Sequence, residues 1–488
     1  SCPAEYEEKL RGAGVEVDRG RRCAHIRAQI EAAAEERGLE VPAAALPLYE
    51  RNADLVEDPH AVLCSFEESF LELPPEVLMS EMMEHQHYFP LFSRGTGRLS
   101  NVFAAVSNIG DNSLTAAGYR RVLRARLNDG KFFYTEDLKK TIEQHGEKLS
   151  SITFHERLGT MDAKVSRIRE VSGALSDLLG LDGAARSRVL AVASLCKNDL
   201  STLMVGEFPE LQGVMGSYYA LSSGHSPEVA HGIREHYLPR FAGDSLPTGV
   251  EGAVVGIADR LDTITGIFSL GLKPSGSKDP FGLRRRVLGI IRIVIALRLN
   301  FPLRKLIAHA ARLFEGPEAG TAGTRPVWEE VPGGGKGEGA AKELPKKRHG
   351  ERVRGGPNES LVPEVEEFFK ARIRSIFEEM GFAYDEIDAS MSNALDDVYE
   401  AYRRVQALHE MRGNEEFARL LVSFKRMANI VEGEALTALA SGFSEARLAE
   451  PEEKALYVHF RAAEGPILAA IAGKDYREVY RLLSGFKP

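Results

Sequence analysis

Two ionisable side chains stand in an apolar segment, where a charge needs a partner. Lys197 and Asp199 follow an apolar run that begins at Ala184, and a helical wheel places both beside the buried stripe. An unpaired charge there would cost on the order of several kcal/mol. The pair therefore predicts either structural ion pairs with other helices or a cleft for phosphate, a metal ion or RNA.

A second acidic pair, Asp259 and Asp262, shares one face of a predicted helix, opposite its apolar stripe. Two carboxylates three residues apart could hold a divalent ion, but no histidine accompanies them. A solvated face, or a salt bridge to Arg260 or to the nearby arginine run, explains the spacing equally well. Together with Lys197 and Asp199 these acids form our candidate cleft, and we predict no metal site.

Two basic clusters are candidates for RNA binding. Arg284, Arg285 and Arg286 follow Asp279-Pro280, which predicts a helix start whose N-terminus adds positive potential for a phosphate. A solvated polar face is the alternative for this cluster.

The second basic cluster lies near the C-terminus of the chain. Lys425, Arg426 and Asn429 can point outward from a helix whose apolar side includes Phe424. Basic groups there would contact phosphates, and the amide could read a base edge. A solvated face is again the alternative.

Composition limits the class of protein that can carry these residues. The 488 residues include 62 Lys+Arg against 71 Asp+Glu, a net charge of −9, with 27% charged and 43% hydrophobic residues. Such a chain is neither a disordered polymer nor a membrane protein, and it should form three or four domains. Its four cysteines include no C-x-x-C pair, so we expect no zinc knuckle, no disulfide framework and a cytoplasmic location.

The elements that must position these residues change in character along the chain. Residues 1–148 predict a mixed α/β module, with a helix over 21–37, buried strands over 62–66 and 102–106, and a Gly-rich turn at 95–97. Residues 149–315 predict a helical domain, and a helix is expected to begin already at Thr135. Further helices are expected to open at Thr160, to span 184–205 and 250–268, and to run from Asp279 through Leu299.

The rest of the chain divides into two parts. Residues 316–358, rich in Gly, Pro and Lys, predict a flexible linker. Residues 359–488 return to helical periodicity. The fold class is therefore α+β and multidomain, mostly α. No P-loop, G-x-G-x-x-G, G-x-S-x-G or H-E-x-x-H motif is present, so we assign no catalytic residue.

Longer strings make the chain resemble a known family. They include LPPEVL from Leu73, HQHYFPLF from His85, RLNDGKFF from Arg126, EFPELQGVMG from Glu207 and GSKDPF from Gly276. In this order over about residues 50–300 they resemble the β subunit of bacterial heterotetrameric glycyl-tRNA synthetase, and FKRMANI from Phe424 extends the likeness.

The resemblance implies a division of labour. The partners it implies are an α subunit, in an α2β2 assembly, and tRNA(Gly). The α subunit would use ATP and Mg to activate glycine, and this chain would bind no cofactor. The first module would be similar to part of the phenylalanyl-tRNA synthetase β chain, the next domain would be an HD-like bundle, and the last would begin an anticodon-binding domain. We also expect the N-terminal region and the C-terminal end of the family to be missing.

One departure from the HD pattern decides between two functions. Asp199 matches the Asp of the His-Asp pair and Asp259 the distant Asp, but Asn198 stands where the pair has its His. An amide is a poor ligand for a transition metal. We therefore expect a tRNA-binding subunit, with a metal-dependent phosphohydrolase as the alternative, and a purely structural assembly protein as the third hypothesis.

Overall fold

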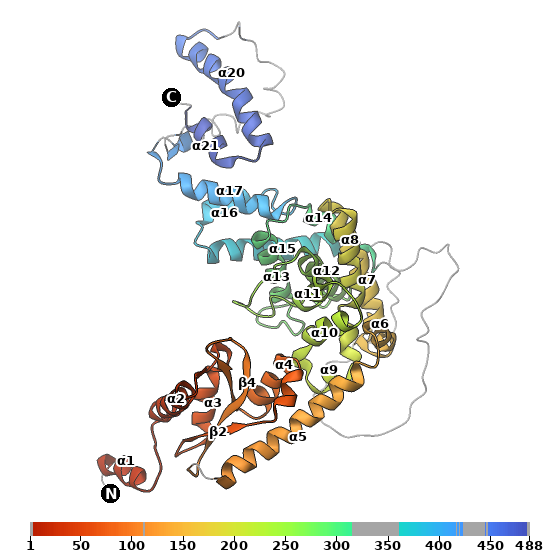
Figure 1. The fold of residues 1–488 in the computed structure, drawn as a ribbon. Helices are drawn as coiled ribbons and strands as arrows, with labels where there is room; N and C mark the ends of the chain where they lie inside the picture. The colour runs from red at the N-terminus through yellow and green to blue at the C-terminus, as the bar shows by residue number, and fades with distance from the viewer. Residues whose placement is uncertain are drawn as a thin grey trace, which may run out of the picture. The chain divides into compact units, whose positions relative to one another are not determined.

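The computed structural model describes residues 3–110, 113–314, 361–422 apart from 416 and 419, residue 445, and 448–485. These residues form two compact units by their internal contacts, 1–173 with 181–256, and 174–180 with 257–488. The described part is mostly helical, with one antiparallel sheet of four strands near the N-terminus (Figure 1). This confirms the mostly α, α+β class. The four-part domain division and the HD-like bundle stay predictions.

The sheet of the first unit has the order β1-β3-β4-β2, with antiparallel neighbours throughout. Its strands are β1 (Leu39–Glu40), β2 (His60–Ser65), β3 (Phe89–Ser93) and β4 (Leu99–Ser107). The expected strands lie within β2 and β4, and the Gly95–Gly97 turn joins β3 to β4. Both predictions are confirmed.

Both faces of this sheet are covered, because residues of one strand alternate between two cores. On β4, Phe103 and Ala105 belong to one apolar cluster, while Ala104 and Val106 belong to the other. The first cluster includes Leu123 and Leu127 of the long helix α5 (Ser113–Asp137), and the second includes Ile26 and Ile30 of α2 (Arg19–Glu36). The period of two in a strand thus places the sheet between two helical layers (Figure 1).

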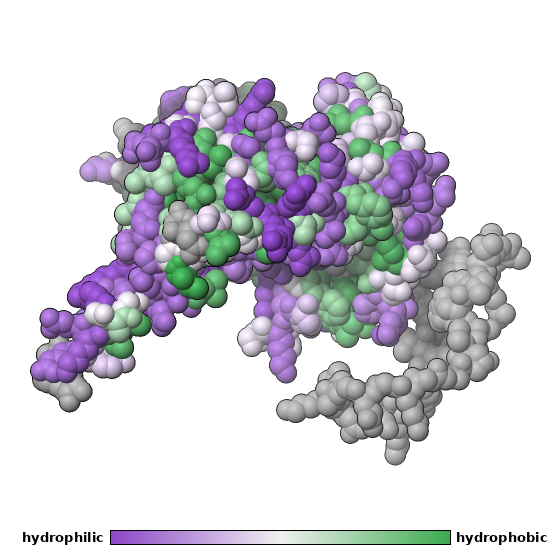
Figure 2. Space-filling model, turned by 60° about the horizontal axis from the view of Figure 1, so that its bottom comes forward, coloured by the Kyte–Doolittle hydropathy of each residue, from purple (hydrophilic) through white to green (hydrophobic). Residues whose placement is uncertain are grey.

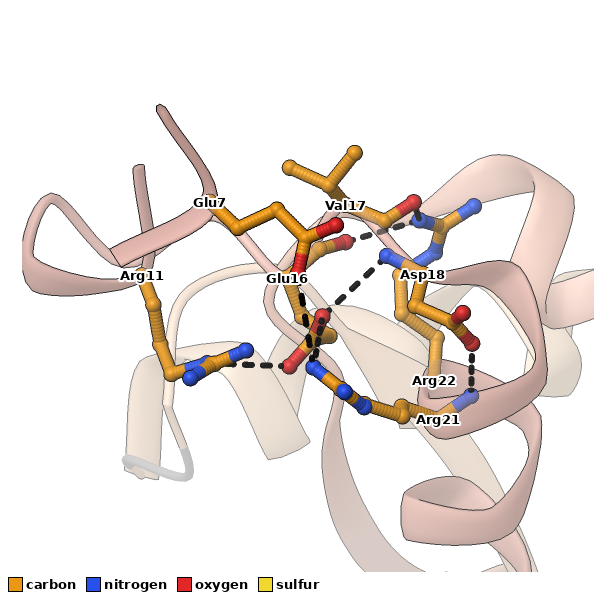
Figure 3. Close-up of polar contacts among 7 residues, drawn as sticks. All are labelled: Glu7, Arg11, Glu16, Val17, Asp18, Arg21 and Arg22. Carbon is orange, nitrogen blue, oxygen red and sulfur yellow. Dashed lines mark hydrogen bonds and ion pairs between the residues drawn. The ribbon is translucent and has the colours of Figure 1, made fainter. Parts of the chain in front are cut away.

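The N-terminal helix α1 (Pro3–Gly12) is joined to α2 by charged side chains, with Glu16 at the centre. Glu16 accepts hydrogen bonds from the Asp18 amide at 3.1 Å and from the Arg11 side chain at 3.2 Å, and Arg21 lies 3.8 Å away (Figure 3). Asp18 in turn caps α2 by accepting from the Arg21 amide at 2.7 Å. These exposed contacts orient the helices but contribute little stability each.

The first unit has further elements before and after α5, some of them short. They are α3 (Pro47–Leu55), α4 (Pro75–Ser80), α6 (Ile142–Gly146), β5 (Thr153–His155), β6 (Gly159–Thr160), α8 (Gly183–Leu195), α9 (Leu203–Glu207), α10 (Val214–Ser222) and α11 (Pro227–Glu235). Two helices, α7 (Met161–Leu178) and α12 (Val250–Ser269), have residues in both units. The expected helices over 160–179 and 250–268 are confirmed as α7 and α12. The helix expected to begin at Thr135 is wrong, because α5 ends at Asp137 and the Thr135 hydroxyl bonds back to the Lys131 carbonyl.

The second unit is helical throughout its described residues. It contains α13 (Leu283–Ala296), α14 (Leu303–Arg312), α15 (Leu361–Glu379), α16 (Tyr384–Ser390), α17 (Val398–Met411), α20 (Pro451–Ala472) and α21 (Tyr476–Ser484). The helix predicted from Asp279 through Leu299 is shorter than expected, because Gly282 adopts left-handed backbone angles and α13 begins after it. Pro280 therefore precedes the helix. The predicted linker lies outside the described residues.

The polar character of the surface (Figure 2) agrees with the 27% of charged residues in the sequence. The face drawn in Figure 2 is largely hydrophilic, and hydrophobic residues form separate areas on it. Among the residues that the structure describes, no helix is long and apolar enough to cross a membrane.

Candidate functional site

The helix predicted over 184–205 is interrupted at the candidate residues. α8 ends at Leu195, a 3-10 turn spans Asn198–Ser201, and α9 begins at Leu203. The break is stabilised by Thr202, whose hydroxyl donates to the Asp199 carbonyl at 2.7 Å and caps α9. Burial of Lys197 and Asp199 was predicted correctly, but from a continuous helix that does not exist.

Asp199 is fully buried and acts as a helix cap. One carboxylate oxygen, Oδ2, accepts the backbone amides of Gly213 at 2.5 Å and of Gly216 at 3.1 Å, which are the cap and first-turn residues of α10. The other oxygen, Oδ1, has no hydrogen-bond partner. Burial raises the pKa of Asp199 to about 6, although the two amides and the nearby Lys197 act in the opposite direction.

The two glycines allow this close approach. Gly213 has a φ of +80°, and a Cβ there would come within 2.6 Å of the Tyr237 ring. A Cβ on Gly216 would lie 2.9 Å from Asp199 Oδ2. The GVMG sequence therefore presents bare backbone to a buried carboxylate.

Lys197 is 4% exposed and is satisfied by aromatic neighbours. Its ammonium group lies 2.8 Å from His236 Nε2 and 3.9 Å from the centroid of the Tyr237 ring. His236 Nδ1 is 2.6 Å from the Ile233 carbonyl, which can only accept, so Nδ1 carries the proton and Nε2 accepts from Lys197. The structural interpretation predicted ion pairs with other helices, whereas here Lys197 contacts a histidine and an aromatic ring and Asp199 accepts backbone amides.

The Asn198 side chain bonds to the backbone of a neighbouring helix. Its side-chain amide donates to the Ile142 carbonyl at 3.1 Å and joins the turn to α6. Within the described ranges, no group of three or more His, Cys, Asp or Glu could hold a metal ion. The side chains of Asn198 and Asp199 therefore bond to backbone groups in the folded core.

Asp259 and Asp262 lie in α12 and are described with the second unit. Their side chains are 6% and 1% exposed, because α12 is buried on every side over this stretch. The solvated face that we considered for them is therefore wrong. Burial lowers the pKa of the adjacent Arg260 to about 10, and the charge of Asp259 opposes that shift. This supports the alternative in which Asp259 compensates a buried arginine.

The arginine run at the start of α13 is only partly exposed. The Arg284 side chain donates to the Gly276 carbonyl at 2.6 Å and Arg286 donates to the Phe281 carbonyl at 3.4 Å, while Arg285 is exposed. The Asp279 carboxylate already accepts the amides of Leu283 and Arg284, each at 2.9 Å. The helix N-terminus is therefore capped from within the chain. The RNA-binding role of these arginines stays a prediction, and Lys425, Arg426 and Asn429 lie outside the described residues.

Sequence reasoning missed a second buried carboxylate, Asp137, that caps a helix as Asp199 does. Asp137 is 3% exposed, and its carboxylate accepts the amides of Leu203 and Met204 and the Tyr219 hydroxyl, each at 2.9 Å. Burial, and then the Asp137 charge, raise the pKa of Tyr219 far above its usual value. The sequence signal was misleading, since an acid after Thr135 is typical of a first helical turn.

Comparison with known proteins gives a consistent match. The glycyl-tRNA synthetase beta subunit family matches residues 1–392. The glycine–tRNA ligase beta subunit of Myxococcus xanthus is 38% identical over the whole chain, that of Natranaerobius thermophilus is 36% identical over 99% of it, and that of Anaeromyxobacter sp. strain K is 38% identical over all of it. The chain spans 64–65% of the length of these relatives.

Replacing Asp199 tests its role as a cap. We expect Asp199→Ala to lower the free energy of unfolding by about 2–5 kcal/mol, because two buried amides lose their acceptor. Asp199→Asn should cost less, since its amide oxygen still accepts. Urea denaturation followed by circular dichroism measures both, and equal stability of Asp199→Ala and the wild type would contradict the assignment.

The raised pKa of Asp199 also predicts a pH dependence. The folded state binds the proton more tightly than the unfolded state, whose Asp has a pKa near 3.8. Binding of this proton therefore makes its full contribution to the free energy of unfolding below pH 3.8. The contribution is lost as the pH rises through about 6, so the free energy of unfolding changes by about 3 kcal/mol.

The matched variant is Asp199→Asn, whose side chain has no carboxyl group to titrate. The stability of the wild type relative to this variant should fall between about pH 4 and 6 and then become constant. A difference that does not change with pH in denaturant titrations would show that Asp199 has no raised pKa.

Proposed function

We propose that this chain, which belongs to the glycyl-tRNA synthetase beta subunit family, binds tRNA(Gly) and positions it for glycylation by a separate α subunit. The observation that carries the proposal is the family match over residues 1–392, joined by identities of 34–38% to beta subunits over nearly the whole chain. In the proposal the two proteins form an α2β2 ligase in the cytoplasm, and ATP and Mg²⁺ act on the α subunit.

The geometry around Asp199 supports a chain that is not itself catalytic. Its carboxylate is used by two backbone amides, and the neighbouring Asn198 amide is used by a carbonyl. A metal-activated water would need these groups as exposed ligands. No observation favours the phosphohydrolase, and the tRNA-binding proposal rests on the family match.

Reconstitution tests the proposal. The full-length protein mixed with purified α subunit, ATP, glycine and tRNA(Gly) should form glycyl-tRNA, measured by acid-precipitable radioactive glycine. The protein without the α subunit should form none. Glycylation in the absence of the α subunit would contradict the division of labour.

The basic pair near the C-terminus gives a second test. Changing both Lys425→Ala and Arg426→Ala should weaken tRNA binding and leave the circular dichroism spectrum unchanged. Loss of one phosphate contact should reduce the slope of log Kd against log salt by roughly 1. The matched control is Lys139→Ala with Lys140→Ala, an adjacent pair of basic residues that is exposed.

Two outcomes would count against this prediction. An unchanged tRNA isotherm for the Lys425 and Arg426 variant would show that the pair is only solvated surface. A wild-type protein that binds no tRNA at any salt concentration would instead favour a structural assembly protein.

A further inference from the structure

An open cavity of about 410 Å³ lies in the second unit, between the end of α12 and the start of α15. Its wall is largely apolar, with two phenyl rings and two prolines, and it carries a few charged groups: Phe268, Pro274, Pro363, Phe368, Lys273, Glu364 and Glu367. The volume is within the range of small-ligand sites. It is large enough for one flat heterocycle.

The aromatic wall is held in place from both sides. The Phe268 and Phe368 ring centroids are 5.1 Å apart, and Phe268 is 4% exposed, so it forms a fixed base for the half-buried Phe368. The Arg372 guanidinium of α15 lies over the Phe368 ring, 4.1 Å from its centroid, so it covers part of one ring face. Unpaired bases stack on aromatic rings and on arginine guanidinium planes, and arginine also neutralises phosphates.

Positive charge continues from this ring toward α13. The pKa of Arg372 is lowered, first by burial and then by the positive charge of Arg284, while Asp279 opposes the shift. Arg284 in turn bonds to the Gly276 carbonyl, in the loop that supplies Lys273 and Pro274 to the cavity. The Asp279 carboxylate, which caps α13, already offsets part of the repulsion between Arg284 and Arg372.

The acidic groups at the cavity suit a base rather than a phosphate. One oxygen of Glu364 pairs with Lys273 at 2.5 Å, and one of Glu367 pairs with Lys370. A carboxylate has acceptor sites for more than one donor, so each can also accept an exocyclic amine. Cytosine, adenine and guanine carry such an amine, whereas uracil does not.

We propose that this cavity binds one unstacked nucleotide of an RNA, with its base against Phe368, its exocyclic amine toward Glu364 or Glu367, and its phosphate toward Arg372. This inference rests on the proposed function, because it identifies a contact for the RNA that the chain binds. It assigns a role to the Phe268–Phe368 pair and to Arg372, and it predicts weaker binding of uracil.

Phe368 is the residue to change. Phe368→Leu keeps the apolar volume but removes the aromatic face, so the dissociation constant for a tRNA(Gly) transcript should rise roughly 10-fold in fluorescence anisotropy. The salt slope should stay unchanged because no charge is lost. Phe368→Tyr should bind like the wild type, and Arg372→Gln should reduce the slope by roughly 1.

A matched control comes from the first unit. Phe241 is 56% exposed and also has an arginine beside it, with Arg240 at 5.7 Å from its ring centroid. Phe241→Leu should leave tRNA binding unchanged. Thermal melts of all variants show whether each is folded, and wild-type protein should bind oligo(C) RNA more tightly than oligo(U) RNA.

The outcomes separate the inference from the proposed function. If the folded Phe368→Leu variant binds tRNA with the same affinity as the wild type, the cavity is not a nucleotide site and the inference is wrong. The proposed tRNA-binding function is unaffected by that outcome. If Phe368→Leu binds RNA normally but binds the α subunit less tightly, the cavity is a protein-docking site and the inference is wrong. A wild type that binds neither tRNA nor oligo(C) contradicts both.

Discussion

Capping of helix N-termini by carboxylates from elsewhere in the chain is the interaction on which much of this structure depends. The first amides of a helix have no partner within it, and in a core they cannot bond to water. Asp137 supplies the acceptor for α9, Asp199 for α10 and Glu235 for the residues before α12. Asp279 does the same for α13 in the second unit. Amide dipoles stabilise each of these charges, of which Asp137, Asp199 and Glu235 are buried.

This constraint explains why residues that resemble a catalytic pair need not be catalytic. A carboxylate whose Oδ2 accepts two amides at 2.5 and 3.1 Å is fixed in position as a helix cap. The buried Lys197 is likewise satisfied by His236 and Tyr237. Charged groups in this core maintain the arrangement of helices, and the groups available for recognition are exposed or half-buried ones such as Arg285 and Phe368.

The predictions that held were those that depend on local pattern. The apolar run over residues 102–106 placed a buried strand correctly, because residues 103–106 face two apolar clusters in turn. The stripe from Val165 to Leu178 and the following Gly180 placed α7, since helical spacing and a left-handed glycine are local properties. The predictions that failed concerned Thr135, where α5 continues to Asp137, residues 184–205, where a turn interrupts the helix, and Asp279-Pro280, where the left-handed Gly282 delays the helix start.

The sequence by itself determined the family, the mostly α class, the strands of the N-terminal sheet and the burial of Lys197 and Asp199. Only the tertiary structure decided what those buried groups do. The partners of Asp199 are 14 and 17 residues away, and those of Asp137 are 66 and 67 residues away. A carboxylate has the same sequence signature whether it holds a metal, faces water or caps a helix. Its role is fixed by which amides the folded chain brings within hydrogen-bonding distance.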